Sequence, residues 1–148
     1  MGVRGIARLL RLSYFEEGEK AQVLELKRAK DEARKRYEEA LNKLEQEFRR
    51  EAEKRGIDEK DRRHAEAIAD LMMELEDKFQ VDTYYQDYAE KAGRYIRAGL
   101  KLAKKEAKRV KPEAIPAIEE IEGILGTPNE IIYRDEIVKI LDKLVSML

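Results

Sequence analysis

The 148-residue chain contains no cysteine and no tryptophan, and His64 is its single histidine. Without cysteine it can form no disulfide, no thiolate metal site and no cysteine nucleophile. Three prolines and eight glycines leave few points at which a helix must break, so the composition favours long helices over many short strands. Ser and Thr together number four and Asn and Gln six, whereas Lys, Arg and Glu abound, a bias typical of hyperthermophile proteins.

Long hydrophobic runs are also missing. No stretch of 18 apolar residues occurs, so we expect no transmembrane helix. The N-terminal segment GIARLLRL is interrupted by arginines and lacks the continuous apolar region of a signal peptide. We therefore expect a protein that stays in the compartment where it is made, the cytoplasm.

Motifs that carry catalytic chemistry are not found either. The sequence has no phosphate-binding glycine loop and no nucleophile elbow, and adjacent carboxylates such as Glu119 and Glu120 diverge on a helix. Asp61 precedes His64 by three residues, a spacing used in di-iron helical bundles, but those sites need two such histidines. His64 also falls in line with Ile68, so we interpret it as a histidine at the edge of the core. We predict no enzyme, no cofactor and no metal site.

The helical pattern itself runs through most of the chain. Periodic apolar positions predict helices over residues 14–55 and 59–80, a third from the Val81-Asp82-Thr83 cap to about Val110, a short one ending at Gly123 and a last one from Pro128. A short connection at Gly56 makes the first two antiparallel neighbours. The predicted fold is all-α: a helix bundle with a long charged antiparallel helical hairpin, formed by residues 20–55 and 59–80. We predict one helical domain over residues 14–148.

Residues 1–13 carry three arginines and no acid. Arg4, Arg8 and Arg11 share one face at helical spacing, while Gly2 and Gly5 weaken a helix at its start. Two interpretations remain open. The segment is either a basic N-terminal arm that becomes helical on a partner, or a first helix that docks on the core through its leucines.

The net charge of −1 conceals a strong segregation of charge. Residues 94–111 carry eight bases and one acid, a charge of +7, whereas the flanking segments 56–93 and 112–148 carry −6 and −5. On a helix the bases fall on one face and Ile96, Leu100 and Ala103 on the other. We call these eight bases the basic rail: Arg94, Arg97, Lys101, Lys104, Lys105, Lys108, Arg109 and Lys111.

Three interpretations of the basic rail follow from its chemistry. It binds a polyanion through about 27 Å of helix, at 1.5 Å per residue, and without base-reading Asn or Gln such contact is independent of sequence. It pairs with the acidic segments, within the chain or across subunits. Or it lies on anionic lipid. The small residues Gly99, Ala103 and Ala107 fit protein packing better than lipid insertion, so we do not expect a membrane partner.

Three tyrosines, Tyr84, Tyr85 and Tyr88, open the helix that carries the rail. Aromatic side chains near cations can stack on the bases of a single strand. More often they pack one helix against another, with hydroxyl groups at the rim. We favour packing.

The hypothesis that combines these features is a non-enzymatic, self-associating structural protein that binds or coats nucleic acid, double-stranded DNA in the first instance, through the arm and the rail. The alternative is a helical interaction module whose rail docks on an acidic protein surface. In size, helical pattern, basic arm and composition the chain resembles the helical coat proteins of filamentous viruses of hyperthermophilic archaea, which wrap double-stranded DNA. The resemblance implies a filament of like subunits and a location in the virion, although the near-neutral net charge departs from the more basic balance expected there.

Overall fold

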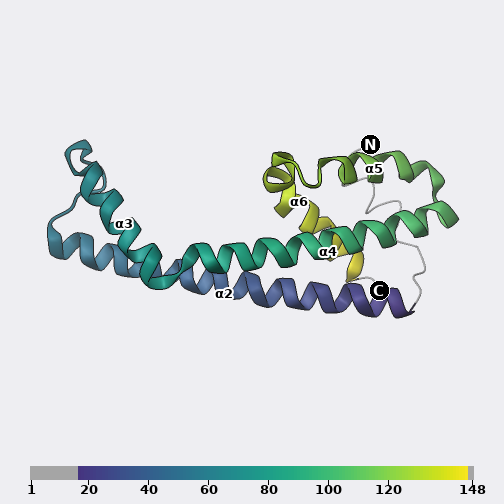
Figure 1. Ribbon diagram of the computed structural model, residues 1–148, viewed down its shortest axis with the longest axis horizontal. Coiled ribbons are helices and arrows are strands. Elements are labelled where there is room, and N and C mark those ends of the chain that lie inside the picture. The colour runs from purple at the N-terminus through teal and green to yellow at the C-terminus, as the bar shows by residue number, and fades with distance from the viewer. Residues whose placement is uncertain (1–16, 147–148) are drawn as a thin grey trace. The chain divides into compact units, whose positions relative to one another are not determined.

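The computed structural model describes residues 17–146 of the chain. The predicted basic arm, with Arg4, Arg8 and Arg11, lies outside the described residues. Within them the structure contains five α-helices, two short 3-10 turns and no strand (Figure 1). In chain order these are α2 (Glu17–Arg55), η1 (Arg62–His64), α3 (Ala65–Phe79), α4 (Val81–Val110), η2 (Pro112–Ala114), α5 (Ile115–Ile124) and α6 (Pro128–Val145). The predicted all-α fold is confirmed.

Contacts divide the described chain into two compact units. One is Asp31–Ala89, and the other combines residues 17–30 with residues 90–146. The long helices α2 and α4 contribute to both units. The prediction of one domain over residues 14–148 stays a prediction.

In the unit Asp31–Ala89, α2 packs against α3 and the start of α4. The core combines the predicted apolar stripe of α2 with two leucines of α3: Leu44, Phe48, Ala52, Leu71 and Leu75. Tyr37 of α2 meets Tyr85 edge to face, with ring centroids 5.4 Å apart, and stacks with Tyr88 at 6.5 Å. The antiparallel hairpin is therefore real, but its returning arm includes the first turns of α4 as well as α3.

The ends of these helices agree only in part with the sequence pattern. Gly56 lies in the predicted connection and adopts the left-handed conformation, with φ of 68°. The predicted start of the next helix at residue 59 is wrong, because Asp61 caps a 3-10 turn and α3 begins at Ala65. The boundary between α3 and α4 is Gln80, which is left-handed at φ of 52°. A cap at residues 81–83 is therefore wrong as well, since α4 has already begun at Val81.

The second unit is built around the apolar face of α4. Ile96, Leu100 and Ala103 are buried there, as predicted, together with residues of α5 and α6. Gly99 faces α6, where a Cβ atom on it would lie 3.1 Å from both terminal carbons of Leu141. Gly99 thus accommodates a side chain rather than another backbone. No helix within residues 17–146 is both long and apolar enough to cross a membrane.

Two features of α6 depart from the sequence pattern. Pro128 begins the helix as predicted. Thr127 and Glu130 have the spacing of a capping box, but its reciprocal bonds do not form: the Thr127 hydroxyl donates to the Ile124 carbonyl, and the Glu130 carboxylate accepts the N–H of Gly126 instead. Ile131 and Ile132 belong to the apolar pattern of the predicted last helix. They are 61% and 69% exposed, so they are not part of the core of the chain.

Candidate nucleic-acid interface

Helix α4 presents the basic rail on its solvent side. Most of the eight bases are exposed, with Lys104 and Lys111 half-buried, while Ile96, Ala103 and Ala107 on the opposite face are fully buried. The predicted amphipathic arrangement is confirmed up to Val110, where α4 ends. Lys111 lies one residue beyond the helix, with φ of −139°, and precedes the turn that Pro112 starts.

Five of the eight rail bases form ion pairs with carboxylates of their own chain. Arg94 pairs with Glu90 at 2.6 Å and Arg109 pairs with Glu106, both within α4. The other three pairs link α4 to different helices: Arg97 with Glu130 of α6 at 2.7 Å, Lys104 with Glu122 of α5 at 3.1 Å and Lys105 with Glu19 of α2 at 2.7 Å. The acidic C-terminal segment supplies two of these carboxylates, so part of the rail pairs within the chain, as the second interpretation expected.

The remaining three rail bases are Lys101, Lys108 and Lys111. None of them has an ion pair or a hydrogen bond to another residue among those the structure describes. Lys101 and Lys108 are seven residues apart, which places them about 10.5 Å apart along one face of α4 at 1.5 Å per residue. Lys101 and Lys108 are therefore the rail bases best placed to bind an anionic ligand together.

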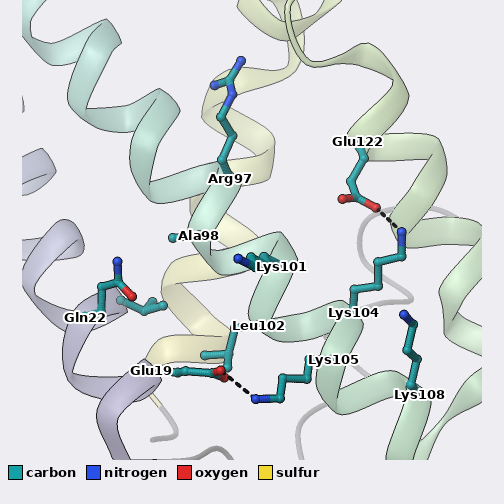
Figure 2. Close-up of a pocket in the computed structure, with 11 residues that line it drawn as sticks. Glu19, Gln22, Arg97, Ala98, Lys101, Leu102, Lys104, Lys105, Lys108 and Glu122 are labelled. Atoms are coloured by element: carbon teal, nitrogen blue, oxygen red, sulfur yellow. Dashed lines mark hydrogen bonds and ion pairs between the residues drawn. The ribbon is translucent and has the colours of Figure 1, made fainter.

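A groove runs beside these lysines (Figure 2). It has a volume of about 680 Å³, with walls from α2, α4 and α5 and apolar contributions from Val23, Ala98 and Leu102. We call it the basic groove. Its charged lining comprises five bases and two acids, a formal charge of +3: Arg97, Lys101, Lys104, Lys105, Lys108, Glu19 and Glu122. The structure thus brings five of the predicted site residues together around one cavity and leaves Arg94, Arg109 and Lys111 outside it.

The pair between Arg97 and Glu130 is more firmly held than the others. Glu130 is buried and also accepts the backbone N–H of Gly126 at 3.0 Å, with Arg134 at 3.9 Å. Burial alone would raise the pKa of Glu130, but the Gly126 N–H, Arg97 and Arg134 together hold that pKa below its usual value. Glu130 is therefore stabilised in its ionised form in the folded protein, and the charge of Arg97 is compensated by this carboxylate.

The tyrosines do not line the basic groove, and none of the eleven residues that line it is aromatic. Tyr88 is buried, and Tyr85 packs against Tyr37. The packing interpretation of these two side chains is confirmed, while Tyr84 is 37% exposed. The groove offers charge but no surface on which a base could stack.

His64 has a structural contact. Its Nδ1 accepts the backbone N–H of Asp58 at 2.8 Å, which closes the loop before α3. Among the described residues, no group of three or more His, Asp or Glu side chains is placed to hold a metal ion.

The chain was compared with known protein families, curated proteins and solved structures. No known protein family, curated protein or solved structure matches this chain. Sequence reasoning missed the two carboxylates that belong to it, Glu19 and Glu122, because their proximity to Lys105 and Lys104 arises from the packing of α2 and α5 on α4. The only signal was the acidic charge of the segment after Pro112.

Proposed function

We propose that the protein binds the phosphate backbone of nucleic acid without sequence specificity, through the basic groove and the lysines beside it. The observation that carries this proposal is the position of Lys101 and Lys108, two exposed lysines on one face of α4 with no ion pair among the described residues, at a groove of charge +3. Phosphate contacts of this kind position a protein on nucleic acid but carry no sequence information.

The chemistry of the lining supports contact by charge alone. Four of the five groove bases are lysines, which bind phosphate as point charges. The one arginine, Arg97, is committed to Glu130. Without an aromatic platform the groove gives no advantage to unstacked bases, so we expect duplex and single-stranded DNA to bind through their phosphates alike.

Self-association completes the proposed role of a structural protein that coats nucleic acid. Three consecutive apolar side chains near the start of α6, Ile131, Ile132 and Tyr133, are 61%, 69% and 46% exposed. Large apolar side chains exposed near one another are common at interaction sites. It supports contact with a second copy of the chain, in the manner of a subunit of an oligomer or filament.

The alternative function is an interaction module whose rail docks on an acidic protein. Five rail bases already pair with carboxylates of the chain, and a partner's carboxylates could bind Lys101 and Lys108 in the same way. This alternative predicts that the same lysines are required for a protein contact and that nucleic acid does not bind.

The salt dependence of DNA affinity tests the proposal. We expect a labelled duplex to bind at 50 mM NaCl, with log K falling linearly against log salt. The slope should be about −3 if Lys101, Lys108 and Lys111 each neutralise one phosphate, and about −4.5 if Lys104 and Lys105 also take part, at about −0.9 per phosphate. The absence of binding at 50 mM NaCl would overturn the proposal and favour the interaction module.

A further inference from the structure

Two carboxylates line the basic groove and form ion pairs with lysines that a bound phosphate would contact. Glu122 of α5 lies 3.1 Å from the Lys104 Nζ, and Glu19 of α2 lies 2.7 Å from the Lys105 Nζ (Figure 2). Both acids line the same cavity as Lys101 and Lys108, which have no ion pair within residues 17–146. Among the described residues, the groove therefore contains lysines paired with carboxylates directly beside lysines that are not.

These two pairs differ from the Arg97–Glu130 pair in how firmly the acid is held. Glu130 is 12% exposed and has two further partners that stay in place, Gly126 and Arg134. The side chains of Glu122 and Glu19 are 35% and 38% exposed, and the described contacts of each carboxylate are with its lysine alone. A surface pair of this kind contributes little to stability. It can open at little cost when a stronger anion arrives.

We propose that Glu122 and Glu19 are internal competitors of the phosphate ligand. Each neutralises one groove lysine in the unbound protein and gives it up, wholly or in part, when a phosphate binds, so the two acids lower the affinity of the groove. The full site then comprises four lysines on one face of α4: Lys101, Lys104, Lys105 and Lys108. The competition presupposes the phosphate binding proposed above.

The test compares two double variants of equal net charge. Glu19→Gln/Glu122→Gln removes both competitors, and Glu120→Gln/Glu136→Gln removes two exposed acids that do not line the groove and have no ion pair among the described residues. Affinity for a labelled DNA duplex is measured for both at 50 mM NaCl. We expect the first variant to bind about 2–25-fold more tightly than the wild type, since each pair released corresponds to roughly 1.4–5-fold. The control should change affinity less than about twofold.

A second arm localises the effect to one pair. In a Lys104→Ala background, Glu122→Gln should give no gain beyond that of Glu120→Gln, because the lysine that it would release has gone. Equal gains in the two double variants would show that only total charge matters, and would overturn the competition while leaving the proposed function intact. If neither the wild type nor Glu19→Gln/Glu122→Gln binds DNA at 50 mM NaCl, the phosphate site itself is wrong.

Discussion

Lys30 lies inside the core with its charge compensated by Asp142. The Nζ of Lys30, on α2, donates to both carboxylate oxygens of Asp142 on α6, at 3.0 and 2.9 Å. Tyr95 of α4 donates its hydroxyl to the same carboxylate at 2.7 Å, and the Lys30 Nζ lies 4.9 Å from the centroid of the Tyr95 ring. Three helices of one unit are thus joined through a single acid. Buried ion pairs contribute little net stability, but they are costly to break from one side.

The two sides of this pair should not cost the same. The Lys30 side chain is 3% exposed and that of Asp142 is 32% exposed, so a lysine left without its carboxylate can recruit less water than a carboxylate left without its lysine. We expect Asp142→Asn to lower the free energy of unfolding by about 3–5 kcal/mol and Lys30→Met by about 1–2 kcal/mol. Urea unfolding followed by circular dichroism measures both. Equal losses would contradict this picture of the pair.

Glu130 is a second acid whose ionised form stabilises the fold. Its pKa in the folded protein is depressed, so its contribution is complete at pH 7 and is lost as pH falls below the ordinary value of 4.5. We expect Glu130→Gln to destabilise the protein by about 1.5 kcal/mol at pH 7, as for hydrogen bonds to a charged group. The difference from the wild type should shrink steadily as the pH falls below about 4.5.

The control for that profile is Glu136→Gln, an exposed acid on the same helix. Thermal melts from pH 3 to pH 7 should show a nearly constant offset for it. A Glu130→Gln offset that is also independent of pH would mean that the carboxylate is not selectively stabilised in the folded state.

At the scale of the helices, Gly99 is a point of close contact between α4 and α6. A Cβ atom at Gly99 would lie 3.1 Å from the Leu141 side chain, whereas one at Gly123 of α5 would meet nothing within 4 Å. Both glycines are helical, and alanine is favoured over glycine in a helix by up to about 1 kcal/mol. Only Gly99 is required by packing.

Substituting these two glycines separates propensity from packing. We expect Gly123→Ala to raise the free energy of unfolding by roughly 0.5 kcal/mol, a modest gain because it lies near the end of α5. Gly99→Ala should gain nothing or lose about 1 kcal/mol, because Leu141 must move by a few tenths of an ångström. A larger gain for Gly99→Ala than for Gly123→Ala would show that α6 yields easily at this contact.

The sequence pattern predicted the helices better than the contacts between them. Apolar spacing located the stripe of α2 and the two faces of α4, because both depend only on the 3.6-residue period. The break after residue 80 was predicted, but its cause was not, because it depends on a non-glycine residue, Gln80, in the left-handed conformation rather than on a cap at residues 81–83. Lys30 falls within the apolar stripe between Leu26 and Ala33, a possible signal of a buried charge, but nothing in the sequence indicates that Asp142 would lie opposite it.

The basic rail shows the same limit. Its residues and its helical face could be predicted, since both follow from local spacing. The sequence could not predict which of these bases pair with carboxylates of other helices. Glu19, Glu122 and Glu130 lie on three different helices, and only the packing of those helices brings them close to α4. Within residues 17–146, the structure leaves Lys101, Lys108 and Lys111 without an ion pair and places Lys104 and Lys105 in partly exposed pairs.

For the whole molecule, the exposed side chains of α6 lead to a prediction about assembly. If Ile131 and Ile132 contact a second copy, the wild type should sediment as an oligomer at tens of micromolar, and Ile131→Ser/Ile132→Ser should sediment as a monomer with unchanged helicity. The reason is that removing apolar surface from water stabilises an interface by about 25 cal/mol per Å², and the serine substitutions remove that apolar surface. Identical sedimentation of the two proteins would place self-association elsewhere or exclude it.

Charge reversal on the rail tests the central claim most directly. Lys101→Glu/Lys108→Glu is compared with Lys139→Glu/Lys143→Glu, which reverses two exposed lysines of α6 and changes the net charge equally. DNA affinity is measured by fluorescence anisotropy at 50 mM NaCl. We predict a loss of at least about 50-fold for the rail variant, with a salt slope shallower by about 2, and a loss of less than about fivefold for the control. Equal losses in the two variants, or no loss in either, would contradict the account.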